Sequence, residues 1–168
     1  ATVHKLTDIA NPHRIWVNDM VFNFIADGRS TLIDGDTGDY LGMLSTGLMF
    51  LNLTIPSHQK EIYAAQTYYS RVHRGERSDF VAIYDASSLS HLAEIPIPAK
   101  RAVTTPSLHH AALTDNDQFM LIYNFTPVMS VSVVDVKSRK FIAEVESPGC
   151  VMVYPTGPRQ FNMLCGDG

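Results

Sequence analysis

The chain has 168 residues, of which 45% are hydrophobic, and this composition is typical of a soluble globular protein. Thirteen lysines and arginines stand against 17 aspartates and glutamates, and the net charge of −4 argues against a nucleic-acid partner, which needs a basic surface. The longest stretch without a charged residue, 40–59, contains Gly42, Gly47, Asn52 and Pro56. These residues indicate strand, turn and strand, so we expect no membrane insertion.

One pattern recurs three times along the chain: a short apolar run that ends in an aspartate, a polar turn, and a second apolar run. The aspartates are Asp34, Asp85 and Asp135, at spacings of 51 and 50 residues. A period near fifty made of short strands is typical of a β-propeller, whose blades are four-stranded sheets. Propellers close with about four to eight blades. The sequence therefore predicts an all-β fold with about three blades and the start of a fourth, the N-terminal part of a larger propeller.

We expect a single partial β-propeller domain over residues 1–168. Blade one is predicted to cover about 13–50, blade two about 51–105 and blade three about 106–148, with the next blade starting at 149–168. In blade one, runs at 13–17 and 21–24 are predicted as strands before the strand that ends at Asp34. Residues 36–39, Asp-Thr-Gly-Asp, are typical of a turn.

The second blade is longer than the third. Residues 60–63 match 118–123, and about seven extra residues follow, which we assign to an insertion at 68–78. Insertions in propeller blades project as loops, where binding concentrates. Arg74 and Arg77 could therefore bind an anion or a partner chain, or simply be solvated.

The two cysteines, Cys150 and Cys165, flank a predicted turn at 154–158. If 151–154 and 160–165 are the arms of a hairpin, the two sulfurs can meet at disulfide distance. The alternative is a pair of buried thiols in a reducing compartment. A disulfide would place the protein outside the cytosol.

No catalytic constellation is visible in the sequence. Residues 34–39 begin like a calcium loop, but Asp39 and Ser45 fill the positions of the required glycine and the closing glutamate, which favours a plain β-turn. His109 and His110 have no partner at zinc spacing, so a structural or surface role is expected. The sequence predicts neither catalytic residues nor a metal site on this chain.

Five ordered blocks of sequence resemble the large subunit of quinoprotein amine dehydrogenases. They lie at 14–20, 32–43, 70–77, 123–135 and 148–158, and so run through essentially the whole chain. Within this family the resemblance is closest to aromatic amine dehydrogenase, and methylamine dehydrogenase is the more distant relative. The resemblance implies a seven-bladed propeller subunit in a periplasmic heterotetramer of two large and two small subunits. It also implies a disulfide between Cys150 and Cys165.

The resemblance places the chemistry in the partner chain. In this family the small subunit carries tryptophan tryptophylquinone, which is built from two of its own tryptophans, whereas the present chain has only Trp16. The resemblance implies oxidative deamination of primary aromatic or arylalkyl amines to aldehyde and ammonia, with electrons passed to a small copper protein such as azurin. The large subunit then scaffolds the small catalytic subunit and shapes the substrate channel. The alternative is a propeller that only binds or scaffolds.

A candidate channel segment follows Gly47. The family has an aromatic large-subunit residue after the glycine that matches Gly47, and here Leu48 takes that place, followed by Met49 and Phe50. Three large apolar side chains in a row are either buried on both faces or covered by a partner. We expect at least one of them, Leu48 first and Phe50 next, to line the entrance to the quinone. Ordinary packing between blades is the alternative.

Overall fold

The structure is a computed structural model that describes residues 4–6, 10–19, 28–48, 52–102 and 107–166. Within these residues it contains strands and one short 3-10 helix, η1, at Leu108–His110. None of the described helical segments is long or apolar enough to cross a membrane. The strands are β1 Arg14–Asp19, β2 Gly28–Asp34, β3 Tyr40–Gly47, β4 Glu61–Tyr69, β5 Arg77–Asp85, β6 His91–Ile97, β7 Ala111–Leu113, β8 Phe119–Asn124, β9 Ser130–Asp135, β10 Lys140–Glu146, β11 Cys150–Gly157 and β12 Gln160–Cys165.

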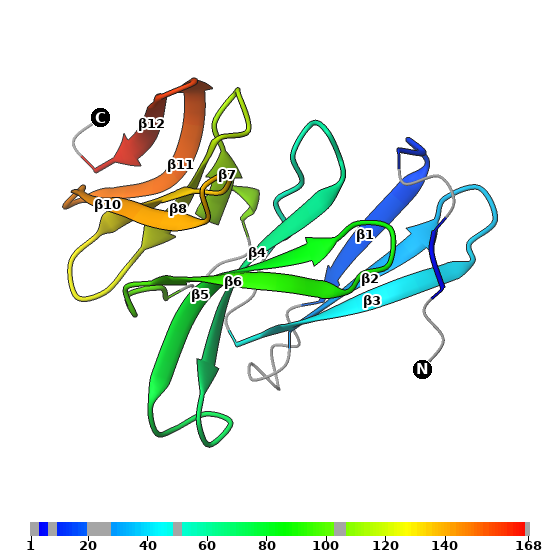
Figure 1. The fold of residues 1–168 in the computed structure, drawn as a ribbon. Helices are drawn as coiled ribbons and strands as arrows, with labels where there is room; N and C mark the ends of the chain where they lie inside the picture. Colours follow the sequence, from blue (N-terminus) through cyan, green and yellow to red (C-terminus); the bar gives the residue numbers. More distant parts are fainter. Residues whose placement is uncertain (1–3, 7–9, 20–27, 49–51, 103–106, 167–168) are drawn as a thin grey trace.

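The strands form four antiparallel sheets in chain order, shown in Figure 1. Blade one is β1-β2-β3, blade two is β4-β5-β6, blade three is β7-β8-β9-β10, and β11-β12 begins a fourth. In blade two, Leu48 and Thr54 form isolated antiparallel bridges to β4. They hold the inner position that β7 holds beside β8 in blade three. This arrangement confirms the predicted partial propeller.

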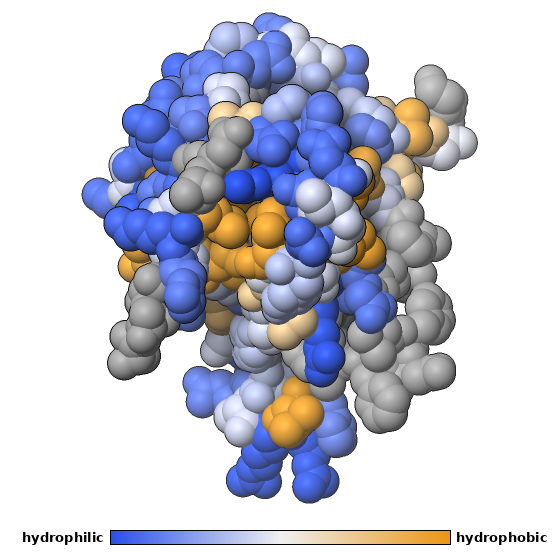
Figure 2. Space-filling model, turned by 90° about the vertical axis from the view of Figure 1, so that its right-hand side faces the viewer, coloured by the Kyte–Doolittle hydropathy of each residue, from blue (hydrophilic) through white to orange (hydrophobic). Residues whose placement is uncertain are grey.

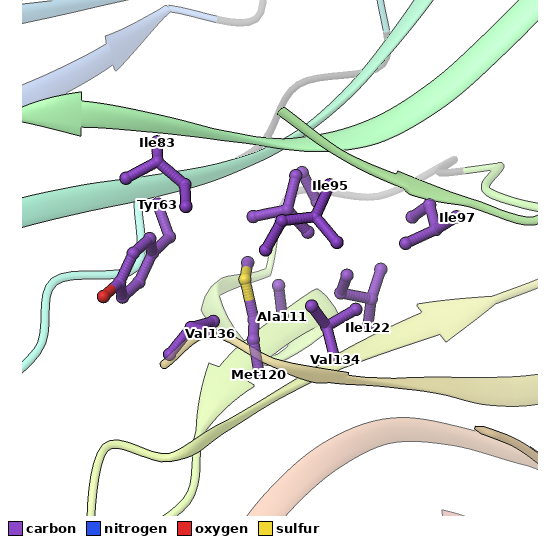
Figure 3. Close-up of a cluster of buried hydrophobic side chains, with 11 residues drawn as sticks. Tyr63, Ile83, Ile95, Ile97, Ala111, Met120, Ile122, Val134 and Val136 are labelled. Carbon is purple, nitrogen blue, oxygen red and sulfur yellow. The ribbon is translucent and has the colours of Figure 1, made fainter. Parts of the chain in front are cut away.

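Blade two is buried on both faces because its two central strands each contain an unbroken apolar run, 62–65 in β4 and 80–84 in β5. Tyr63 and Ile83 face blade three, where they pack with Met120 and Ile122 in the core that Figure 3 shows. The alternate residues of β4 and β5 face blade one. There they form a second core cluster, whose buried members are Leu44, Ile62, Ala64, Ala82, Tyr84 and Ala86. Strands packed on both faces read as continuous apolar runs rather than alternating ones. The cores of this fold therefore lie between the blades.

The three repeated aspartates occupy equivalent places, as the period predicts. Asp34 is the last residue of β2, Asp85 of β5 and Asp135 of β9. Each of these strands is followed by the turn that leads to the last strand of its blade. One carboxylate oxygen of each accepts the backbone N–H groups two and three residues later. The residue four positions after each aspartate has a positive φ: 77° at Gly38, 57° at Leu89 and 55° at Arg139. The repeat is therefore one turn geometry used three times in this chain, and residues 34–39 form a turn.

The structure corrects several details of the sequence analysis. The expected insertion of about seven residues within 68–78 is confirmed as the loop 70–76, and only the ends of that range are paired, because β4 extends to Tyr69 and β5 begins at Arg77. The expected turn at 154–158 is shorter, since β11 continues to Gly157 and only Pro158 and Arg159 lie between the strands. His109 and His110, to which the sequence analysis assigned no element, lie in η1. The strand expected at 21–24 lies outside the described residues.

The free side of blade one is partly apolar. Ile15 and Val17 of β1 are 52% and 47% exposed, while Trp16 between them packs against the cluster shared with blade two. Figure 2, which views the molecule from this side, shows an apolar patch surrounded by hydrophilic surface. Apolar faces of this kind are covered by neighbouring repeats in repeat architectures.

Candidate functional site

The sheets present two different edges. At one edge lie the turns of Asp34, Asp85 and Asp135. At the other edge, which we call the crossover edge, β3, β6 and β10 end, and the chain crosses to the next blade. The hairpin loop 70–76 also lies at the crossover edge, because β4 runs parallel to β6 and ends there. The candidate channel residue and the longest hairpin therefore share one edge of the molecule.

Leu48 lies at the crossover edge, directly after β3. Its N–H donates to the carbonyl oxygen of Thr67 at 2.9 Å, and its side chain is 6% exposed in this chain. Gly47 forms the expected bend with φ 69°, and a Cβ there would lie 2.7 Å from Cζ of Tyr68. The close approach of the Tyr68 ring therefore requires glycine at this position. Met49 and Phe50 lie outside the described residues.

A buried polar cluster secures the base of the β4–β5 hairpin. The Arg77 guanidinium donates from Nε and Nη2 to the two oxygens of Asp79, at 2.8 and 2.7 Å, and Nη2 also donates to the carbonyl of Arg101. The Arg101 guanidinium donates to Thr67 Oγ1 at 2.9 Å. The Arg101 N–H donates to Asp79 Oδ2 at 3.2 Å. Four residues from β4, β5 and the crossing after β6 are thereby held in one arrangement.

The electrostatics of this cluster explain why its charges can be buried. Arg101 is buried, with 4% of its surface exposed, and this burial lowers the pKa of its guanidinium to about 10, although the nearby Asp79 carboxylate acts to raise it. Arg101 is therefore still charged at neutral pH, and Asp79 compensates the charge. Removing one partner of such a buried pair leaves an uncompensated charge, which is strongly destabilising. The cluster is suited to positioning the hairpin rather than to proton transfer.

A groove of about 640 Å³ opens beside the same strands. Its walls include Tyr68 and Phe80, whose rings stack with centroids 5.7 Å apart. Tyr84 and Pro96 extend the apolar lining, and Glu94 places a carboxylate at the groove. Aromatic walls next to a negative charge suit an aromatic group that carries a cation.

The cysteines form the disulfide that was one of the two sequence-based alternatives. Cys150 and Cys165 are directly opposite each other in the β11–β12 ladder, with Cα atoms 4.0 Å apart and a sulfur–sulfur bond of 2.00 Å. The hairpin with arms near 151–154 and 160–165 is therefore confirmed.

The remaining predicted residues are not brought together. The His109 ring lies tilted against that of Tyr154 with centroids 4.2 Å apart, whereas His110 is buried against Tyr123. Among the described residues, no group of three or more histidines, cysteines, aspartates or glutamates could hold a metal ion. Asp79 and Arg101 were not predicted from the sequence. The available signal was a single acidic residue at the start of an otherwise apolar run, 79–84.

Comparison with solved structures defines the class of protein as a β-propeller. The chain is similar to the dihydro-heme d1 dehydrogenase NirN, with a TM-score of 0.63 and 17% identity over 99% of this chain and 33% of that one. It is also similar to the β-propeller domain of the trilobed protease from Pyrococcus furiosus, with a TM-score of 0.50 and 10% identity over 90% of this chain and 48% of the other. At these identities the likeness concerns the fold alone.

The sequence identifies the family within this class. Residues 11–168 match the family model of the methylamine dehydrogenase heavy chain, and the chain belongs to this family. It is 35% identical over 136 residues to the heavy chain from Methylobacillus flagellatus, which covers 81% of this chain and 34% of that relative. It is 33% identical over 159 residues to the heavy chain from Methylorubrum extorquens, covering 94% and 38%. The chain thus spans about a third of the length of these relatives.

These relatives confirm the coarser part of the sequence-based identification, a large subunit of the quinoprotein amine dehydrogenases. Both relatives are named methylamine dehydrogenase heavy chains, whereas the sequence analysis gives methylamine dehydrogenase as the more distant relative. An aromatic amine substrate is therefore taken up as a proposal under Proposed function.

Proposed function

We propose that this chain is part of the large subunit of a periplasmic amine dehydrogenase that converts primary aromatic or arylalkyl amines to aldehyde and ammonia. The observation that carries the proposal is the family match over residues 11–168. The proposed assembly contains two large and two small subunits, and an azurin-like copper protein accepts the electrons. The disulfide between Cys150 and Cys165 supports a location outside the cytosol.

The redox cofactor belongs to the small subunit in this proposal. Trp16 is the single tryptophan of the chain, and it packs against the core shared by blades one and two, so this chain does not supply the two tryptophans that tryptophan tryptophylquinone needs. When present in the partner, the quinone takes up the two electrons released by oxidation of the amine.

In the reaction, this chain helps to bind and orient the amine substrate and to exclude water from the channel. The crossover edge places Leu48 next to β4, where its position is fixed by the hydrogen bond to Thr67. An apolar side chain at the entrance of a channel discriminates between amines by the size of the group it contacts. The groove next to the stacked Tyr68 and Phe80 supports a preference for aromatic amines, because its walls match their shape and charge.

The experiment is a steady-state assay of the purified complex that contains the full-length large subunit. Aldehyde and ammonia should form from phenylethylamine with a higher kcat/KM than from methylamine. A higher kcat/KM for methylamine would contradict the proposed aromatic substrate, but it would still agree with an amine dehydrogenase. Absence of turnover with any primary amine would favour the alternative function, a propeller that only binds or scaffolds.

A further inference from the structure

The β4–β5 hairpin continues beyond its sheet as a two-stranded ribbon. β6 pairs with β5 only as far as Asp79, which lies opposite Ile97, whereas β4 and β5 pair on to Tyr69 and Arg77. In Figure 1 this ribbon points downward, away from the blades. It carries residues 70–76, which we call the ribbon tip, clear of the surface of this chain.

The ribbon tip is held in a defined shape. The N–H of Ser70 donates to the carbonyl of Glu76 at 2.9 Å, and the N–H of Arg71 donates to the carbonyl of Arg74 at 3.0 Å. Gly75 has φ 94°, and a Cβ there would lie 2.4 Å from Ser70 Oγ. The Arg77–Asp79 pair fixes the base of the ribbon. The tip therefore presents its side chains from a rigid support.

The tip carries a local positive charge on a chain whose net charge is −4. Arg71, His73 and Arg74 are all exposed, and Glu76 is the one carboxylate in the tip. Arg71 and Arg74 form no ion pair with any other residue that the structure describes. Two guanidinium groups are thus available for carboxylates of another molecule.

Val72 stands between these charges in a conformation that does not suit it. Its φ is 68° and it is 68% exposed. A β-branched residue in the left-handed region is strained, and such strain is concentrated at binding and switch sites. Arginine is enriched among the residues that dominate binding at protein interfaces, and the exposed Val72 adds apolar contact area between Arg71 and Arg74.

We propose that the ribbon tip docks on the small subunit, with Val72 in an apolar pocket and Arg71 and Arg74 paired with carboxylates around it. This inference rests on the proposed function, which supplies the partner. It is supported by the position of the ribbon: Thr67 at its base accepts the hydrogen bond from Leu48, so a subunit that reaches the crossover edge at β3 also lies close to the ribbon. The charges of the tip require that the pocket be rimmed by acidic residues.

The test measures the dissociation constant between the full-length large subunit and the small subunit separated from the same complex. The double variant Arg71→Glu, Arg74→Glu should weaken association about tenfold or more and reduce its dependence on salt. Lys140→Glu is the matched control, because Lys140 is exposed at the opposite edge of the blades. It should leave the dissociation constant unchanged.

Val72→Gly separates docking from folding. Glycine relieves the positive φ, so the thermal midpoint of the large subunit should rise or stay the same while association weakens. Equal association of the wild type, the charge variant and the glycine variant would overturn the ribbon-tip interface and leave the proposed function intact. No association even of the wild type would overturn both. Loss of binding to phosphatidylglycerol vesicles with unchanged subunit association would make the tip a membrane contact instead.

Discussion

Asp85 illustrates how one carboxylate organises a blade. Its Oδ1 accepts hydrogen bonds from the hydroxyl and the N–H groups of Ser87 and Ser88, at 2.6 to 3.0 Å. These bonds, led by that of the Ser87 hydroxyl, lower the pKa of Asp85 to about 2. Because the pKa is about 3.9 in the unfolded chain, the ionised group stabilises the fold fully above about pH 4. This contribution is lost as the pH falls through about 2.

Replacing Asp85 by asparagine should therefore remove part of the acid sensitivity. The asparagine side chain keeps an acceptor oxygen but no charge, so we expect Asp85→Asn to lower the free energy of unfolding by about 1 kcal/mol at pH 7. The loss should shrink as the pH falls toward 2. Urea denaturation of the full-length protein across this range measures it, with the exposed Asp115→Asn as control. A pH-independent loss in Asp85→Asn would contradict the account.

Leu48 can be tested in the assembled enzyme. If it lines the channel, Leu48→Ala should change the ratio of kcat/KM for phenylethylamine and methylamine by about tenfold, since one or two methylenes in an apolar pocket are worth about 1–3 kcal/mol. Leu44→Ala is the matched control, because Leu44 is also a buried leucine, lies in β3 just before Leu48, and belongs to the core. Loss of stability in both variants with an unchanged ratio would assign Leu48 to ordinary packing between blades.

At the scale of elements, the repeated turn depends on a backbone position with positive φ as well as on the aspartate hydrogen bonds. Gly38 has φ 77°, and a Cβ on it would meet no atom within 4 Å. Gly38→Ala should therefore lower the free energy of unfolding by about 1 kcal/mol through the left-handed backbone alone. Gly157→Ala, where a Cβ finds only ordinary contacts from 3.4 Å outward, serves as control in the same thermal melts. Equal effects of the two substitutions would count against this explanation.

The β11–β12 hairpin depends on its disulfide. Cys150 and Cys165 are 15 residues apart, and closing a loop of this length is worth about 3 kcal/mol in the chain-entropy model. Titration of the unfolded, unreduced protein should find no free thiol from this pair. The double variant Cys150→Ser, Cys165→Ser should lose about that much stability. Two reactive thiols in the unreduced protein would disprove the bond and weaken the periplasmic assignment.

At the scale of the whole molecule, the repeat was readable because the same turn chemistry recurs at Asp34, Asp85 and Asp135. The hairpin closed by Cys150 and Cys165 was readable because its sequence contains both arms and a turn. The full length of β4 and β5 was not predictable, because a charged residue such as Arg77 is typical of a loop. Only the structure shows that Arg77 pairs with the buried Asp79.

The candidate site was predicted less completely than the fold. The glycine bend before Leu48 is local, so the sequence alone revealed it. The cluster of Arg77, Asp79 and Arg101 joins residues from two strands and a crossing, and its partners become evident only when the strands are paired. Long-range electrostatic contacts of this kind have no periodic pattern in the sequence.

The central claim is that this chain belongs to a large subunit that works only with a quinone-bearing partner. The most direct measurement is native mass spectrometry of the complex purified through the full-length large subunit, combined with its visible absorption spectrum. We predict two large and two small chains, with a visible absorption carried by the small chain that changes when phenylethylamine is added. A large subunit that purifies alone, colourless and indifferent to amines, would contradict the account.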